Sequence, residues 1–237
     1  MCPERNLHMT RYFAKDTPLA GLERMMMSVP GFQHRGSGVR ILNRFRYRAE
    51  DLNCRYCLHY QRKGCIIPVC PYIAERLESG AIGYRELVME CFGTIPHTAF
   101  QQRIRAVENW DGPDQGNLTR MENWQTSCFC EKESKPNPSW LAAAYLLASR
   151  ESLWQAAFPA LSYAHIDFHR VGLHGFSAQD YPLFYAAKRL YARRPPMAME
   201  ELSDPHLIKD SIFLDIIYAV LIARYGAAVM QKRRLIP

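Results

Sequence analysis

The sequence predicts a mainly α-helical protein with a small strand or hairpin and a zinc-knuckle front region. Apolar residues recur at helical spacing in most segments, the single alternating segment is short, and four of the eight cysteines lie within seventeen positions. Of the 237 residues, 48% are hydrophobic and 22% are charged, which is typical of globular proteins. This composition excludes disordered, collagen-like and coiled-coil proteins.

The composition changes near residue 135. All eight cysteines and ten of the thirteen glycines precede that point, and Ala- and Leu-rich stretches follow it. We therefore expect a cysteine-bearing basic front region with a four-cysteine metal knuckle over residues 1–135. A helical bundle region over 136–237 packs with it as one unit.

The front region is predicted to open with a helix that Thr17 caps and Pro18 begins, and this helix stops before Pro30. Residues 40–48 alternate, so that Arg44, Arg46 and Arg48 share one face of an extended strand. Three further helices are expected at 71–80, 84–91 and 97–110. A turn is expected over 111–117 and a polar linker over 131–138.

The back region is predicted to contain helices at about 139–149, 151–158, 178–193 and 209–225. Asn137 and Pro138 begin the first of these helices, and Ser177 with Asp180 resembles a capping box for the third. Gly226 stands where a helix-ending glycine belongs. The stripe on the third helix is assigned to the core and not to a ligand site; it consists of Tyr181, Phe184, Tyr185, Lys188, Leu190 and Tyr191.

Residues 212–230 form the only membrane-like stretch, and Asp215 and Arg224 interrupt it. A membrane span needs about 20 predominantly apolar residues, so a buried core helix is the better interpretation. Residues 1–13 are charged and polar and lack the apolar region of a signal peptide. We therefore expect a cytoplasmic protein with reduced or metal-bound thiols and no membrane partner.

Four cysteines form the motif Cys54-x2-Cys57-x7-Cys65-x4-Cys70. A C-x-x-C turn supplies two ligands of a tetrahedral zinc ion, and the second pair has permitted spacing. Structural Zn²⁺ is the favoured interpretation. An iron–sulfur cluster is an alternative that the Cys70-Pro71 pair encourages, and unliganded or redox-active thiols are another.

Positive charge gathers around this motif. The chain carries a net charge of +7, and residues 31–66 hold eight Arg and Lys against two Asp and Glu, a net charge of +6. Basic side chains interleaved with aromatic ones suit phosphate contact and base stacking. The residues expected to bind the anionic partner are Arg44, Arg46, Arg48, Arg55, Arg62 and Lys63. The alternative is an exposed arginine face that only keeps the protein soluble.

Two weaker patterns also contain metal-binding residue types. A metal ion could be bound by His165, Asp167 and His169, although no H-E-x-x-H motif is present. Cys128 and Cys130 could complete a second site with Cys91 or His97. The phosphate-binding and nucleophile-elbow motifs G-x-x-x-x-G-K-[ST], G-x-G-x-x-G and G-x-S-x-G are absent.

Several stretches together resemble a family of proteins encoded on conjugative and other mobile elements of gut Firmicutes. These are RYFAKDTPLAGLERMMMSVPGF, CRYCLHY with CIIPVCPYIAERL, AAAYLLASRESLWQ, YPLFYAAKRLY and VLIARYG. No activity is assigned to that family, so the resemblance implies a context and no catalytic residues. Mobile elements carry proteins for transfer, for regulation and for disabling host defence, including anti-CRISPR inhibitors.

The sequence thus leads to a hypothesis of a non-enzymatic, zinc-stabilised accessory protein that binds nucleic acid or a nucleoprotein complex, such as a CRISPR effector. One alternative is a direct protein inhibitor of a host defence nuclease, of the anti-CRISPR type. A second alternative is a metal-dependent enzyme that uses the His165, Asp167 and His169 cluster.

Overall fold

The computed structural model describes residues 18, 20–28, 48–62, 64–128, 137–162 and 165–230. The chain divides into two compact units, Met1–Phe45 and Arg46–Pro237. In the first unit the structure describes helix α1 (Ala20–Met27), which confirms the helix predicted after Pro18. Apart from Arg48, the strand predicted over 40–48 lies outside the described residues. The division predicted at residue 135 stays a prediction.

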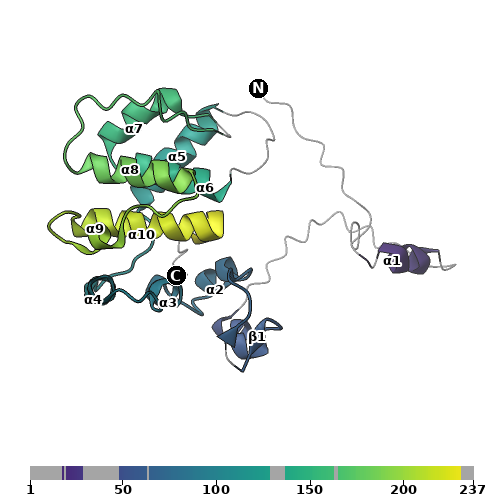
Figure 1. The fold of residues 1–237 in the computed structure, drawn as a ribbon. Coiled ribbons are helices and arrows are strands. Elements are labelled where there is room, and N and C mark those ends of the chain that lie inside the picture. Colours follow the sequence, from purple (N-terminus) through teal and green to yellow (C-terminus); the bar gives the residue numbers. More distant parts are fainter. Residues whose placement is uncertain are drawn as a thin grey trace, which may run out of the picture. The chain divides into compact units, whose positions relative to one another are not determined.

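The second unit begins with short elements and continues with helices (Figure 1). Two 3₁₀ turns, η1 (Ala49–Leu52) and η2 (Cys54–Tyr56), precede a hairpin of β1 (Tyr60–Gln61) and β2 (Gly64–Cys65). The helices that follow are α2 (Ile73–Glu78), α3 (Tyr84–Phe92), α4 (Thr98–Ala106) and α5 (Gln115–Cys128). Within the described residues the hairpin is the only sheet, so the predicted mainly α fold with a small hairpin is confirmed.

The remaining elements form the helical back of this unit. They are α6 (Pro138–Ala148), α7 (Glu151–Ala157), η3 (Phe158–Ala160), α8 (Asp180–Tyr191), α9 (Met199–Ser203), α10 (Asp210–Tyr225) and η4 (Gly226–Val229). The predicted cap at Asn137 is confirmed, whereas the capping box predicted at Ser177 is only half formed, because α8 begins at Asp180 and no side chain caps it. Thr17, the third predicted cap, lies outside the described residues. The Asn137 side chain accepts from the Trp140 N–H at 2.8 Å, and the Asp180 carboxylate accepts from the Ser177 N–H at 2.8 Å. Gly226 ends α10 with φ +66°, a conformation that favours glycine.

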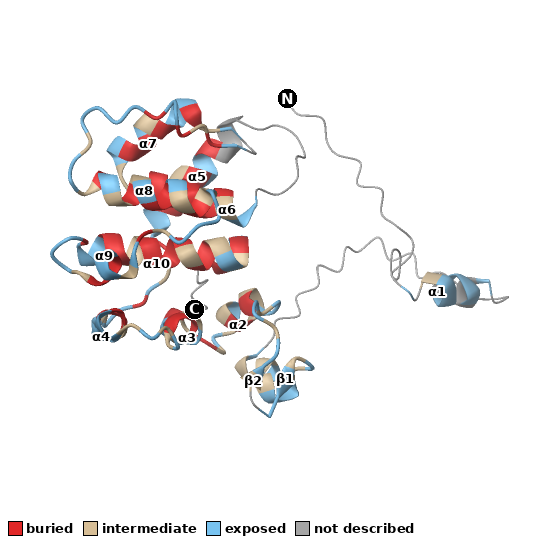
Figure 2. Ribbon diagram, viewed as in Figure 1, coloured by how far each residue is buried: buried red, intermediate tan, exposed pale blue. Residues whose placement is uncertain are grey.

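Helix α6 lies at the centre of the core. Every residue from Trp140 to Ala148 is buried, and α8, α10 and α5 pack around the helix (Figure 2). Three consecutive alanines, Ala142 to Ala144, have no exposed surface, and their small side chains let the neighbouring helices approach closely. A helix that is apolar on all sides is stable only when it is covered on all sides.

Helix α10 is the second core element. Residues Asp210–Val229 are long and apolar enough to cross a membrane by length and composition, with a mean hydropathy of 1.8. In this fold 56% of an 18-residue apolar portion of that stretch is buried. Phe213, Ile216 and Ile217 have no exposed surface, as predicted for a core helix.

Some sequence predictions were wrong. The turn predicted over 111–117 is shorter, because α5 begins at Gln115, and the helix predicted to reach Trp110 ends at Ala106. The aromatic stripe of α8 is only partly core, since Tyr181 and Tyr185 are each 49% exposed. The buried face of α8 instead carries small and aliphatic residues, namely Leu183, Ala186, Ala187 and Leu190.

A buried arginine joins α4 to the back of the fold. The Arg103 guanidinium donates to the carbonyls of Leu202 and Ile208 and to the Asp210 carboxylate at 3.0 Å. It also lies 4.4 Å from the ring centroid of Phe213. One side chain therefore holds the segment between α9 and α10 against α4.

Replacing this arginine tests that role. We expect Arg103→Met to lower the free energy of unfolding by about 2–4 kcal/mol, because two buried carbonyls lose their donor. Urea denaturation measures the loss. Arg105→Met is the matched control on the exposed side of α4 and should change stability by less than about 0.5 kcal/mol. Equal effects of the two substitutions would contradict the assignment.

Candidate functional site on the cysteine segment

Residues 48–72 are here called the cysteine segment, and their described part forms turns and a hairpin without a hydrophobic core. None of its described residues is buried, and the first buried side chain after it is Ile73 (Figure 2). Large apolar side chains on the segment are exposed instead, among them Leu58 at 95% and Tyr56 at 80%. Burial of apolar surface therefore contributes little to its stability.

The first cysteine pair lies on a tight turn. The Asn53 side chain caps this turn by accepting from the Arg55 N–H at 3.0 Å. The Cys57 N–H then donates to the Cys54 carbonyl at 3.0 Å. The C-x-x-C spacing thus folds back on itself, which is the local conformation that a metal knuckle requires.

The second cysteine pair begins on the hairpin, because Cys65 is the last residue of β2. Tyr60 pairs with Cys65 and Gln61 with Gly64, and the Ile66 N–H extends the ladder to the His59 carbonyl at 2.9 Å. Gly64 has φ +117°, so the turn between the two strands depends on glycine there. The hairpin brings Cys65 back beside the chain that follows Cys57.

The four thiols match zinc in kind and number, but they are not gathered into one centre. Cys54, Cys57, Cys65 and Cys70 are all free thiols. Within the part of the chain that the structure describes, no group of three or more His, Cys, Asp and Glu side chains lies close enough to hold a metal ion. The donor set therefore fits zinc chemically, and metal binding requires the thiols to converge.

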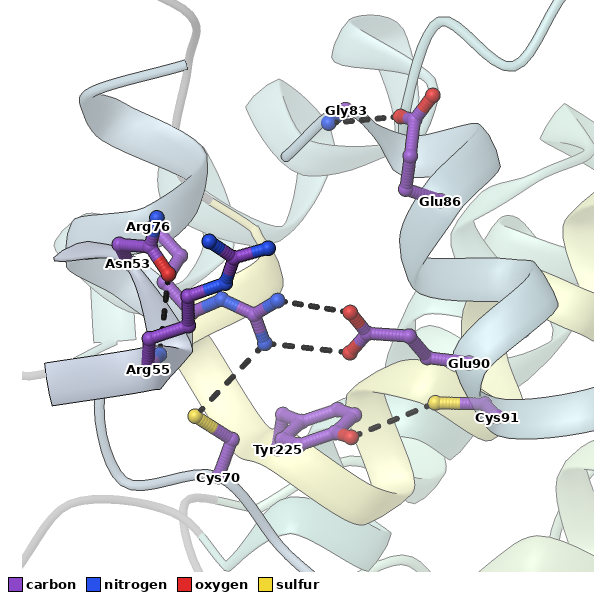
Figure 3. A network of polar contacts seen from close by, with 9 residues as sticks. All are labelled: Asn53, Arg55, Cys70, Arg76, Gly83, Glu86, Glu90, Cys91 and Tyr225. Carbon is purple, nitrogen blue, oxygen red and sulfur yellow. Dashed lines mark hydrogen bonds and ion pairs between the residues drawn. The ribbon is translucent and has the colours of Figure 1, made fainter. Parts of the chain in front are cut away.

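One buried arginine connects Cys70 to the helices (Figure 3). Arg76 on α2 forms two parallel hydrogen bonds to the Glu90 carboxylate on α3, at 2.7 and 3.1 Å, and its Nη1 lies 4.0 Å from the Cys70 sulfur. Burial lowers the pKa of Arg76, but Glu90 and the Cys54 and Cys70 thiols outweigh burial and raise it above its ordinary value. A fixed positive charge therefore stands beside two of the four thiols.

A second arginine attaches the end of the segment to α10. The Arg224 guanidinium donates to the Pro68 carbonyl, between Cys65 and Cys70. Nearby, the Cys91 sulfur lies 3.3 Å from the Tyr225 hydroxyl (Figure 3). Burial raises the pKa of the Cys91 thiol, which disfavours its thiolate form.

The outer surface of the hairpin carries the predicted basic residues that the structure describes. An open hollow of about 750 Å³ is lined by Arg55, Tyr60, Gln61 and Arg62. Arg48 is exposed at the start of the segment. The other predicted partner-binding residues, Arg44, Arg46 and Lys63, lie outside the described residues.

The weaker metal patterns are not assembled in the described part of the chain. His165 Nδ1 lies 2.8 Å from the Tyr191 hydroxyl, and Asp167 accepts from the His169 N–H in a local turn. These residues form neither a helix nor a regular strand. The side chains of Cys128 and Cys130 lie outside the described residues, so their proposed pairing stays a prediction.

Sequence reasoning missed the two arginines that anchor the segment. Arg76 and Arg224 each lie on a helix whose pattern is otherwise explained by packing. Arg224 was noted only as an interruption of an apolar stretch. That interruption was the available signal, because a charge in an apolar helix needs a partner.

Comparison with protein-family models, with curated proteins and with solved structures gives no match for this chain.

Proposed function

We propose that this protein is a non-enzymatic, zinc-stabilised accessory protein of a mobile element that binds nucleic acid or a nucleoprotein complex through the cysteine segment. The observation that carries this proposal is the hollow lined by Arg55, Tyr60 and Arg62 on a segment whose described residues include no buried side chain. Arginines supply phosphate contacts and the tyrosine ring supplies a stacking surface.

The case for zinc is energetic. Ordering a residue costs about 1–2 kcal/mol of backbone entropy, and small segments without a core are usually held by disulfides or metals. The four thiols here form no disulfide. Zinc held by Cys54, Cys57, Cys65 and Cys70 would supply the missing cross-link and leave no open coordination position, so its role is structural.

The arginine beside the thiols supports the same proposal. Four thiolates around one Zn²⁺ leave a net negative charge, and Arg76 stands next to Cys70 to balance it. The Glu90 carboxylate fixes the orientation of that guanidinium. This partnership resembles the supporting interactions that orient metal ligands in proteins.

The exposed tyrosines favour single-stranded nucleic acid as the partner. Tyr56 and Tyr60 are 80% and 45% exposed, and both belong to a stretch without Asp or Glu between Asp51 and Glu75. Bases in a duplex are already stacked on one another, whereas unpaired bases are free to stack on an aromatic ring. We therefore propose that a single strand binds along the hairpin.

Zinc content is the first prediction. Purified protein should contain about one Zn per chain, since a closed four-thiolate site holds a single ion. Substitution Cys57→Ser or Cys70→Ser should abolish the stoichiometric zinc, as measured by elemental analysis. Cys91→Ser is the matched control and should retain the zinc, because the Cys91 thiol is in hydrogen-bond contact with the Tyr225 hydroxyl and is not one of the four proposed ligands.

Two results would contradict the zinc proposal. One is a brown preparation that contains iron, which would indicate a cluster. The other is native protein that contains no metal, together with a Cys57→Ser variant of unchanged thermal stability.

Salt-dependent binding is the second prediction. The probe is a fluorescein-labelled oligothymidine strand, measured by fluorescence anisotropy across a salt series. We expect Arg55→Gln with Arg62→Gln to reduce the slope of log K against log salt by about 1.4, because each lost single-strand phosphate contact contributes about 0.7. The control is Arg85→Gln with Arg105→Gln, which removes the same charge from α3 and α4.

The stacking contribution is tested with the same probe. Tyr60→Ala should weaken binding by about 1–3 kcal/mol, and Tyr60→Phe should restore most of it. Equal affinity for the single strand and for a matched duplex would contradict the strand preference. Equal salt slopes for the two arginine pairs would contradict the site.

A specific observation favours a second candidate function, direct inhibition of a host defence nuclease by protein contact. Large apolar side chains are concentrated on the cysteine segment, and such exposed clusters mark protein interfaces. They are Tyr56, Leu58, Tyr60, Ile66, Val69 and Tyr72. This function needs Leu58 and Ile66, whereas nucleic-acid binding needs Arg55 and Arg62.

Co-purification separates the two functions. The protein and its Leu58→Ser, Ile66→Ser variant are each mixed with a guide-free CRISPR effector and with the oligothymidine probe. The inhibitor function would be favoured if the native protein captures the effector and the Leu58→Ser, Ile66→Ser variant does not, while the variant still binds oligothymidine. Loss of oligothymidine binding only in the arginine variant would favour the nucleic-acid function.

A further inference from the structure

A polar cleft of about 600 Å³ opens between the loop before α5 and the helices α6 and α10. It shares no residue with the cysteine segment. Its ionisable and phenolic lining comes from four parts of the chain and includes Asp111, Asp114, Tyr145, Arg150, Asp215 and Tyr218. The charges inside it come from residues that are far apart in sequence.

The floor of the cleft is held by two buried tyrosines. The Tyr145 hydroxyl accepts from the Asp114 N–H at 3.0 Å, and the Tyr218 hydroxyl accepts from the Gly112 N–H at 2.9 Å. Because a backbone N–H can only donate, the Tyr145 hydroxyl directs its own proton to Asp215 Oδ1 at 3.1 Å. The loop before α5 is thereby fixed over α6 and α10.

Arg150 has hydrogen-bonding capacity that the described residues do not use. Its Nε is buried without a partner, and its Nη2 reaches only the Ser211 hydroxyl at 3.5 Å. A buried N–H of a guanidinium without an acceptor is unfavourable. A carboxylate in the cleft would accept from this guanidinium in the paired geometry that arginine prefers.

Asp215 is the complementary group. The pKa of the Asp215 carboxyl is raised to about 6, chiefly by burial. The hydrogen bond from Tyr145 and the charge of Arg150 act to lower this pKa, and the charge of Asp114 acts to raise it. Among the described residues its Oδ1 has Tyr145 as a partner and its Oδ2 has none. A ligand cation placed here would stabilise the carboxylate.

The charges are ordered along α10. Ser211, Asp215 and Tyr218 line the cleft from one helix face, and seven residues of helix span about 10 Å. Arg150 adjoins the Ser211 end, and Gly112, next to Asp111, adjoins the Tyr218 end. The lining has three carboxylates and two guanidiniums, so it complements a ligand with a net positive charge.

We propose that this cleft binds a free α-amino acid with a cationic side chain. Its α-carboxylate binds Arg150, its α-ammonium binds Asp215, and its side-chain cation lies toward Asp111 and Asp114. The proposal is independent of zinc and of nucleic-acid binding, since none of the residues involved belongs to the cysteine segment.

Isothermal titration calorimetry of the full chain tests this with L-arginine, agmatine and L-glutamate. We expect L-arginine to bind at least tenfold more tightly than agmatine, which lacks the carboxylate. Arg150→Met should remove that advantage and leave agmatine affinity within twofold, whereas Arg85→Met on α3 should change neither. Agmatine affinity equal to that of L-arginine, preference for L-glutamate, or no binding of L-arginine at ~10 mM would overturn the proposal.

The pH profile gives a readout that misfolding would not imitate. The charged and titratable groups around Asp215 are Tyr145 on α6, Arg150 before α7, Asp111 and Asp114 before α5, Arg120 on α5 and Tyr218 on α10. Asp215 must be ionised to hold the ammonium, so L-arginine affinity should rise about tenfold per pH unit up to pH 6 and then level off.

The substitution Asp215→Asn keeps an acceptor for Tyr145 and removes the charge. It should weaken L-arginine binding at pH 7.5 and abolish the rise below pH 6, while a thermal melt confirms that the variant is folded. An unchanged pH profile in this variant, or affinity in the native protein that falls as pH rises, would overturn the assignment.

Discussion

The complete burial of α6 is the constraint on which the rest of this fold depends. Nine consecutive side chains, Trp140 to Ala148, must be covered, and α5, α8 and α10 supply that cover. Two polar side-chain groups lie among them: the Trp140 indole N–H donates to the Ser162 carbonyl, and the Tyr145 hydroxyl donates to Asp215 and accepts from the Asp114 N–H. The same packing that closes the core therefore also builds the wall of a charged cleft, because a phenol in the middle of a buried helix needs polar partners.

The cysteine segment depends on a different kind of interaction. Its described residues bury no side chain, and its attachments to the helices are polar: Arg76 reaches Cys70, and Arg224 reaches the Pro68 carbonyl. Such a segment presents its arginines and tyrosines outward because it has no core to place them in. A hydrophobic helical scaffold that carries a small exposed surface element accounts for both halves of the composition, the Ala- and Leu-rich helices and the basic cysteine motif.

Local patterns predicted the features that local physics determines. Asn137 as a cap, Gly226 as a helix end and the C-x-x-C turn at Cys54 could be assigned from neighbouring residues alone. Helix α5 was missed for two reasons. Its buried stripe of Leu118, Met121 and Trp124 is surrounded by polar residues, and the helix begins within DGPDQGN, a typical turn sequence. The anchors and the cleft could not be predicted, since their partners are far apart in sequence. Tyr145 and Asp215, for example, are separated by 70 positions.

The central claim is that metal coordination, and not burial, holds the cysteine segment in place. Hydrogen–deuterium exchange of the full chain with and without a zinc chelator tests it most directly. The account predicts that the amides of Cys57, Tyr60 and Ile66, which donate within the turn and hairpin, lose their protection on chelation, while amides of α6 and α10 keep theirs. Equal protection of the segment before and after chelation would contradict it.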